Sequence, residues 1–324
     1  MRSTQSFLDV GKVKKGDTIP SGGGTPTFSV RLKKFWRRNR EGWMFTFPLA
    51  LGLGIFTLYP MIQSLIWSFF EYTGVYYYPT GLKNYISIFS GTTFWRVFGN
   101  TCFYTFVNVP IILVVSYLLA SLVNLPLKAV GGFRVAYYLP CVIPGVVSGL
   151  LWQDIFSANG IFNQILAVFG AHSDFFSSPE TTTAIGSIFL MNLWSVGGGM
   201  ILWLSAFKAI PTQLYEAAKI DGAGYFRRLF AITVPMSTPI LFYNAVTSMI
   251  GGLQVFGTYA NYGTGVDDSL NFIAIRIYVT AFQDSFPGNY GLACAMAWIL
   301  FFIIGALTLV MFKTGGWIQY GEDS

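Results

Sequence analysis

Residues 210–235 read IPTQLYEAAKIDGAGYFRRLFAITVP, a polar and charged stretch that leads from one long apolar run of the chain into the next. The runs that it joins, 183–207 and 229–256, are each long enough to cross a bilayer as a helix, which needs about 20 residues for a core of roughly 30 Å. Four further runs have the same character, at 43–70, 97–125, 135–156 and 290–312. The sequence therefore predicts an all-α polytopic membrane protein with six transmembrane helices.

The composition agrees with a membrane protein and argues against an enzyme. Of the 324 residues, 53% are hydrophobic and 10% are charged, against roughly 25% charged in an ordinary soluble domain. His172 is the single histidine, and Cys102, Cys141 and Cys294 are far apart without a CxxC pair, so no metal-ligand cluster is indicated. The sequence contains no GxxxxGK[ST] phosphate loop. We therefore expect no catalytic residue, no metal site and no ATP site of that kind in this chain.

The basic residues predict the orientation of the spans. If both termini lie on one side, 17 of the 20 Lys and Arg residues lie there, and Lys83, Arg96 and Arg276 lie opposite. The positive-inside rule then places both termini and residues 210–235 in the cytoplasm, as expected for a multi-pass protein of the cell inner membrane. The net charge of +6 thus reflects topology, and a nucleic-acid partner is not expected.

The chain divides into three parts by composition. Residues 1–42 form a basic cytoplasmic leader, and its segment 30–43 mixes Leu, Phe and Trp with Arg and Lys, a pattern typical of an interfacial amphipathic helix on anionic lipid. A regulatory contact with a cytoplasmic partner is the alternative for this leader. Residues 43–315 form the transmembrane domain, and residues 316–324 form a short cytoplasmic tail.

Local signals predict a short helix within residues 210–235. Pro211 ends the preceding helix, and Thr212 can cap a new one. Glu216 is expected in the first turn, where the helix dipole favours a carboxylate, and Gly222 can supply a left-handed stop.

One face of this short helix is expected to be apolar. Leu214, Tyr215 and Ala218 fall on it at helical spacing, and the small alanine side chains permit close approach of another surface. Such a face fits insertion into the groove of a partner, or packing against the chain's own body.

Three motifs in this region closely resemble a known signature. Glu216-Ala217-Ala218, Asp221-Gly222-Ala223 and the sequence Ile-Thr-Val-Pro at 232–235 resemble the permease subunits of binding-protein-dependent type I ABC importers. The string at 210–218 is similar to the carbohydrate-uptake branch, with its maltose permeases, and the general pattern is closest to the alginate oligosaccharide importer. The resemblance covers about residues 43–315, with Val234 where Leu usually precedes the proline.

The resemblance implies that the helix between the fourth and fifth spans is a cytoplasmic coupling helix. In the family this helix sits in a cleft of a separate ATP-binding subunit dimer, which holds ATP and Mg, so this chain would carry no cofactor. A second homologous permease subunit, an extracytoplasmic solute-binding protein and membrane lipid are the other partners implied. The residues that the resemblance assigns to coupling are Glu216, Ala217, Ala218, Asp221, Gly222 and Ala223.

Polar residues inside the fourth and fifth apolar runs are candidates for a substrate path, because polar groups at membrane depth are costly and often functional. Amides, hydroxyls and aromatic rings together suit a sugar. Helix packing is the alternative role, since such groups also bond helices together at about 0.6 kcal/mol each. The candidates are Asn192, Trp194, Tyr243, Asn244, Ser248 and Gln254.

The sequence is compatible with two other functions and with several substrates. A stand-alone secondary transporter or channel for a polar solute is the main alternative to an ATP-driven importer, and a membrane enzyme is the third. An acidic sugar such as an alginate oligosaccharide, a neutral oligosaccharide and glycerol phosphate are all compatible with the motifs.

Breaks are expected in three of the predicted spans. Pro235, Pro239 and the glycines at 251–252 interrupt the fifth, and three successive glycines at 197–199 interrupt the fourth. A comparable weak point lies in the second span, where Tyr104, Thr105 and Asn108 precede Pro110. Such broken helices suit a gate that rocks, although a harmless kink is equally common.

Overall fold

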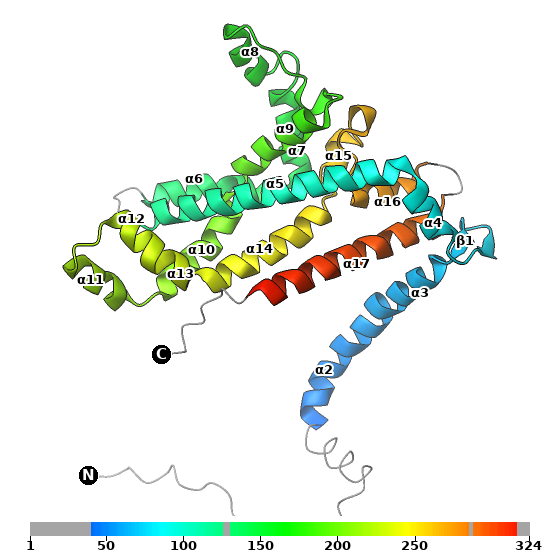
Figure 1. The fold of residues 1–324 in the computed structure, drawn as a ribbon, viewed down its shortest axis with the longest axis horizontal. Coiled ribbons are helices and arrows are strands. Elements are labelled where there is room, and N and C mark those ends of the chain that lie inside the picture. The colour runs from blue at the N-terminus through cyan, green and yellow to red at the C-terminus, as the bar shows by residue number, and fades with distance from the viewer. Residues whose placement is uncertain (1–39, 126–129, 285–287, 316–324) are drawn as a thin grey trace, which may run out of the picture. The chain divides into compact units, whose positions relative to one another are not determined.

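The structure is a computed structural model that describes residues 40–125, 130–284 and 288–315 (Figure 1). The described residues fall into two compact units, with the boundary between Pro60 and Met61. The described part of the chain is mainly helical, with one two-stranded sheet. The predicted interfacial helix at 30–43 and the tail at 316–324 lie outside the described residues, apart from the first residues of α2.

Three helical stretches are long and apolar enough to cross a membrane unbroken. The first, Met44–Trp67, comprises α2 (Arg40–Leu53), the π-helix η1 (Gly54–Leu58) and α3 (Tyr59–Trp67). The second is α5 (Thr92–Val123), and the third is α17 (Tyr290–Thr314). These correspond to the predicted first, second and sixth spans, so a polytopic helical membrane protein is confirmed.

The three remaining predicted spans are bent pairs of helices. The pairs are α6 (Val130–Val142) with α7 (Gly145–Ile155), bent by 98°, α9 (Thr181–Trp194) with α10 (Gly197–Ala209), bent by 49°, and the stretch Tyr225–Met236 with α14 (Thr238–Leu253), bent by 67°. Six spans are therefore present if each bent pair is one span.

Proline accounts for two of these bends. Pro144 stands in extended conformation immediately before α7. Pro235 and Pro239 flank the break at Ser237, because proline lacks the amide donor that a regular α-helix needs. The π-helix η3 (Leu229–Thr233) precedes this break. The expected break in the fifth span is confirmed, whereas the sharper bend in the third was not expected.

Short elements connect the spans. A hairpin of β1 (Phe70–Tyr72) and β2 (Tyr77–Pro79) pairs Glu71 with Tyr78 and is followed by α4 (Lys83–Ser90). Farther along lie α8 (Ile161–Val168), η2 (Phe175–Ser177), α15 (Tyr259–Tyr262), η4 (Val266–Asp268) and α16 (Ile273–Phe282). The connection from α10 to α14 carries α11 (Thr212–Ile220), α12 (Tyr225–Arg228), η3 and α13 (Val234–Met236).

Helix α5 is the centre of the second unit, where it packs against α14 and α10 (Figure 1). Gly252 permits the first contact, because a Cβ there would lie 2.8 Å from Thr105 Cγ2. The second contact buries Trp203, which donates from Nε1 to Ser116 Oγ at 2.9 Å. Small residues at such positions let helix backbones approach closely within a bilayer.

Candidate functional site

The short helix α11 ends in a turn that explains the Asp-Gly-Ala motif. Gly222 has φ +74°, a left-handed conformation that glycine adopts without steric cost. The Gly222 amide donates to Lys219 O at 3.1 Å, and the Ala223 amide donates to Ala218 O at 2.8 Å. These two bonds form a Schellman motif, which satisfies carbonyls that the helix end would otherwise leave unpaired. The predicted glycine stop is confirmed.

The predicted start of α11 is wrong in two details. Pro211, not Thr212, occupies the capping position, with extended backbone and no side-chain cap, and Thr212 is the first helical residue. Glu216 therefore lies beyond the first turn, which holds no acidic residue. Because the dipole effect fades within one turn, Glu216 is not placed there to stabilise the helix end.

The side chains of α11 do not form the single apolar face that the sequence predicted. Tyr215 turns toward the body of the chain, where its hydroxyl lies 2.9 Å from Thr233 Oγ1, and Ala218 beside it is half-buried. Glu216, Ala217 and Asp221 are exposed. Tyr215 and Ala218 thus hold the helix to its own protein, and the outward face is built around Glu216 and Ala217.

A second polar site lies between α5, α9 and α14. Asn192 on α9 donates from Nδ2 to Tyr104 Oη at 3.0 Å and to Asn108 Oδ1 at 3.3 Å, both on α5. Ser248 and Gly251 on α14 complete the lining of a cavity of about 270 Å³. An amide, a phenol and a hydroxyl from three helices therefore meet inside one cleft.

This cleft continues into a second cavity of about 270 Å³ toward α6 and α15. Tyr104, Asn192 and Ser195 line both cavities. Asn192 uses only its Nδ2 in the hydrogen bonds to α5, which leaves its Oδ1 beside the cavity that Ser248 also lines. No Lys, Arg, Asp or Glu is among the described residues that line the two cavities.

The other four predicted path residues lie elsewhere. Trp194 is half-buried and packs edge-on against Trp152, with ring centroids 5.9 Å apart. Tyr243 and Gln254 are exposed, and Asn244 is buried, with its Nδ2 unpaired in the described part of the chain. The structure brings Asn192 and Ser248 together and leaves these four outside the cleft lining.

Tyr104 and Asn108 are cleft residues that the sequence indicated only as a weak point in the second span. Their spacing of four residues puts both on one face of α5, which is a signal for a polar stripe in an otherwise apolar helix. The contact with Asn192, more than 80 residues away in the sequence, could not be foreseen from that spacing alone.

A wider cavity of about 440 Å³ opens beside η2 and α15, lined by Gln153, Asp174 and Asn261 among others. Tyr262 also borders it and donates to Gly149 O at 2.8 Å. Burial raises the pKa of Tyr262, so its hydroxyl remains a protonated donor at neutral pH. In the described ranges, no group of three or more His, Cys, Asp and Glu side chains is placed to hold a metal ion.

Comparison with known proteins decides the family. The probable ABC transporter permease protein YesP of Bacillus subtilis (strain 168) is 33% identical over 291 residues, which cover 87% of this chain and 93% of YesP. The chain belongs to the ABC transporter permease family. The lactose transport system permease protein LacF of Rhizobium radiobacter is 29% identical to this permease, over 87% of the chain and 95% of LacF. No protein-family model matches the chain.

Solved structures show the same fold. The crystal structure of a bacterial alginate ABC transporter, in complex with an alginate pentasaccharide-bound periplasmic protein, contains a chain that superposes on this permease with a TM-score of 0.78 at 22% identity. The match covers 88% of this permease and 97% of that chain. The resemblance to sugar ABC permeases and to the alginate importer is thus confirmed. This permease is a membrane-spanning component of a transport system.

Proposed function

We propose that this permease is the membrane-spanning subunit of an ATP-driven importer for a carbohydrate, most simply an oligosaccharide. The observation that carries the proposal is the cleft between α5, α9 and α14, where Asn192 and Ser248 line one cavity together with Tyr104. Amides, hydroxyls and aromatic rings are the groups that hold sugars. Relatives named for lactose and for trehalose and maltose transport support the substrate class.

The lining of the cleft favours a neutral sugar over an acidic one. A uronic acid such as an alginate unit carries a carboxylate, which is held most strongly by Arg or Lys. The described lining contains neither. An acidic oligosaccharide is the second candidate, supported by the fold shared with the alginate transporter, and glycerol phosphate is the third.

Energy would reach this permease through α11. Its outward face carries Glu216 and Ala217, and the Asp221-Gly222-Ala223 turn sets the angle at which the chain leaves the helix. We propose that this face docks in a cleft of a separate ATP-binding subunit dimer, which holds ATP and Mg. Ala217 would permit close approach, and Glu216 would bind a basic or polar group there.

The remaining partners follow from the same role. A second homologous permease subunit would complete the path that one set of spans leaves open, and a solute-binding protein would deliver the sugar from outside. This permease would lie in the cell inner membrane with both termini in the cytoplasm, as the distribution of Lys and Arg indicates.

The test is the ATPase activity of the reconstituted complex. Binding proteins loaded in turn with a neutral oligosaccharide, an alginate oligosaccharide or glycerol phosphate are added to proteoliposomes that hold the complex. We expect the neutral oligosaccharide to stimulate hydrolysis several-fold. Failure of an ATPase subunit to co-purify with this permease, or no stimulation by any loaded binding protein, would refute the proposal.

A further inference from the structure

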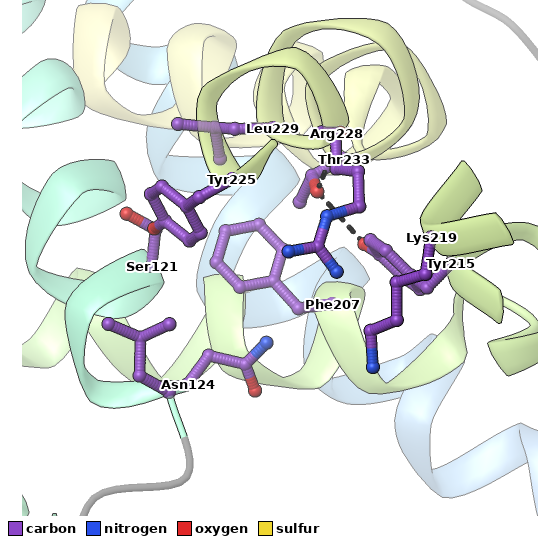
Figure 2. A pocket seen from close by; sticks show the side chains of 10 residues that line it. Ser121, Asn124, Phe207, Tyr215, Lys219, Tyr225, Arg228, Leu229 and Thr233 are labelled. Carbon is purple, nitrogen blue, oxygen red and sulfur yellow. Dashed lines mark hydrogen bonds between the residues drawn. The ribbon is translucent and has the colours of Figure 1, made fainter. Parts of the chain in front are cut away.

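A cavity of about 250 Å³ lies behind α11, on the face that turns toward the body of the chain. Four segments form its walls: the C-terminal end of α5, the end of α10, α11, and α12 with η3 (Figure 2). This pocket is separate from the substrate cleft, since the two share no lining residue. Its polar lining includes Ser121, Asn124, Tyr215, Lys219, Tyr225 and Arg228.

The charge in this α11 pocket is all of one sign. Lys219 and Arg228 line it, and no acidic residue is among its described lining. The ion pairs found in the described ranges join other residues, so neither cation has a carboxylate within 4.0 Å there. Two cations that line one pocket without a counter-ion attract an anion.

Two polar atoms in the pocket walls are buried and unpaired. Arg228 Nε and Tyr225 Oη both lack a hydrogen-bond partner within the part of the chain that the structure describes. Figure 2 shows the Arg228 guanidinium reaching into the middle of the pocket, between Tyr225 on one side and Tyr215 and Lys219 on the other. Buried donors are normally satisfied, so their free state here points to a missing acceptor.

The end of α5 does not supply that acceptor. Its last carbonyls carry partial negative charge, but Arg134 donates to Val123 O at 3.4 Å from outside the pocket lining. Arg228 and Lys219 therefore have no acidic partner within the described chain.

We propose that the α11 pocket binds a phosphate group, either a free phosphate compound or the headgroup of an anionic phospholipid. The donors that line the pocket come from different segments: the guanidinium of Arg228, the ammonium of Lys219, the hydroxyl of Tyr225 and the amide of Asn124. A tetrahedral oxyanion has acceptor oxygens in several directions, whereas a carboxylate has two in one plane. Arg is also the side chain best suited to bidentate phosphate binding.

Such a ligand would link α11 to α5 and α12, because its oxygens would bond to residues of all three segments. It would stabilise the position of α11 on the body of the chain. The proposed phosphate site is argued from the residues of this pocket alone, so it does not depend on the proposed sugar transport.

The first measurement uses inorganic phosphate. The full-length permease is placed in phosphatidylcholine nanodiscs, and ³¹P line broadening of added phosphate reports binding. Arg228→Gln is expected to weaken binding by about tenfold or more, the loss of one charge-assisted bond. Arg227→Gln is the matched control, because Arg227 is adjacent, exposed and absent from the pocket lining, and it should leave binding within about twofold.

The second measurement tests the lipid source. Native mass spectrometry counts the phosphatidylglycerol that the permease retains from nanodiscs of phosphatidylglycerol and phosphatidylcholine in equal amounts. Retention by the wild type and by Arg227→Gln, with loss in Arg228→Gln, assigns the site to a lipid headgroup. Arg228→Lys keeps the charge and should retain partial binding of whichever source is used, even if Arg228→Gln does not fold.

Two outcomes would overturn the proposal. One is the absence of binding of either phosphate source by the wild type. The other is an equal loss in Arg227→Gln and Arg228→Gln, which would show general electrostatic attraction to a basic surface rather than a built site.

Discussion

Asn192 joins two helices and also lines the proposed substrate cleft. Its Nδ2 holds α9 to α5 through Tyr104 and Asn108, while its Oδ1 lies beside the cavity. The packing role and the substrate role, which are alternatives for a polar residue in a span, are thus compatible here. Ser248 lines the same cavity from α14.

Replacing Ser248 tests the substrate path directly. A neutral hydrogen bond contributes about 0.5–1.5 kcal/mol, so we expect Ser248→Ala to raise the KM for sugar uptake by roughly threefold to tenfold. Ser205→Ala is the control, because Ser205 is exposed on α10, donates to Ile201 O and is absent from the cavity lining. An unchanged KM in Ser248→Ala, measured by uptake of labelled sugar in proteoliposomes, would remove Ser248 from the path.

Replacing Gly222 tests the turn that ends α11. A side chain at φ +74° costs about 1–2 kcal/mol, which should reshape the turn while the chain stays folded. We expect Gly222→Ala to raise the number of ATP molecules hydrolysed per sugar transported. Gly224→Ala is the control, since Gly224 has φ −68° and open space around it. Normal coupling in Gly222→Ala would contradict the role given to this turn.

The sequence predicts Gly222 well and Tyr104 poorly, for a physical reason. A left-handed stop depends on the local backbone, so glycine after a helical pattern is enough to locate it. Whether a residue lines a cleft depends on which helices pack together. Tyr104 is bonded to Asn192, which is 88 residues away in the sequence. Tyr243 and Gln254, chosen only for polarity in an apolar run, are exposed instead.

At the scale of elements, helix breaks are the main departure from a simple count of spans. Prolines at 235 and 239 mark one break in the sequence, and the structure bends there by 67°. The bend of 98° at residues 142–145 was not predicted, although Pro144 precedes the second helix of the pair. An X-Pro step restricts the residue before it, but the direction taken by the next helix is set by tertiary packing.

The contact between α5 and α14 gives a stability prediction. Gly252→Ala would place a Cβ 2.8 Å from Thr105 Cγ2, and overpacking of this kind costs about 1–3 kcal/mol. We expect the apparent Tm of the purified permease to fall by roughly 2–10 °C. Thr105→Ala in the same chain should restore part of the loss, because it removes the methyl group that the new Cβ meets.

Gly251→Ala is the control for this contact, because nothing lies within 4 Å of a Cβ at that position. Equal Tm values for Gly251→Ala and Gly252→Ala would show that close helix approach at Thr105 does not stabilise the fold.

At the scale of the whole molecule, hydropathy predicts the spans but not which side of the membrane each loop occupies. The side follows from Lys and Arg, and it can be tested by labelling single cysteines in a chain whose three native cysteines are replaced by serine. Asn159→Cys is expected to react with an impermeant maleimide in intact spheroplasts. Gln213→Cys, on α11, should react only after permeabilisation. The reverse labelling pattern would show that the chain has the opposite orientation in the membrane.

The proposed function depends on α11 receiving energy from another subunit. The most direct test is ATP-dependent uptake of labelled oligosaccharide into proteoliposomes, with a loaded binding protein outside and ATP inside. We predict uptake when this permease is reconstituted with its partner permease and ATP-binding subunits, and none when the ATP-binding subunits are left out. Equal uptake without them would contradict the account and favour a stand-alone transporter or channel.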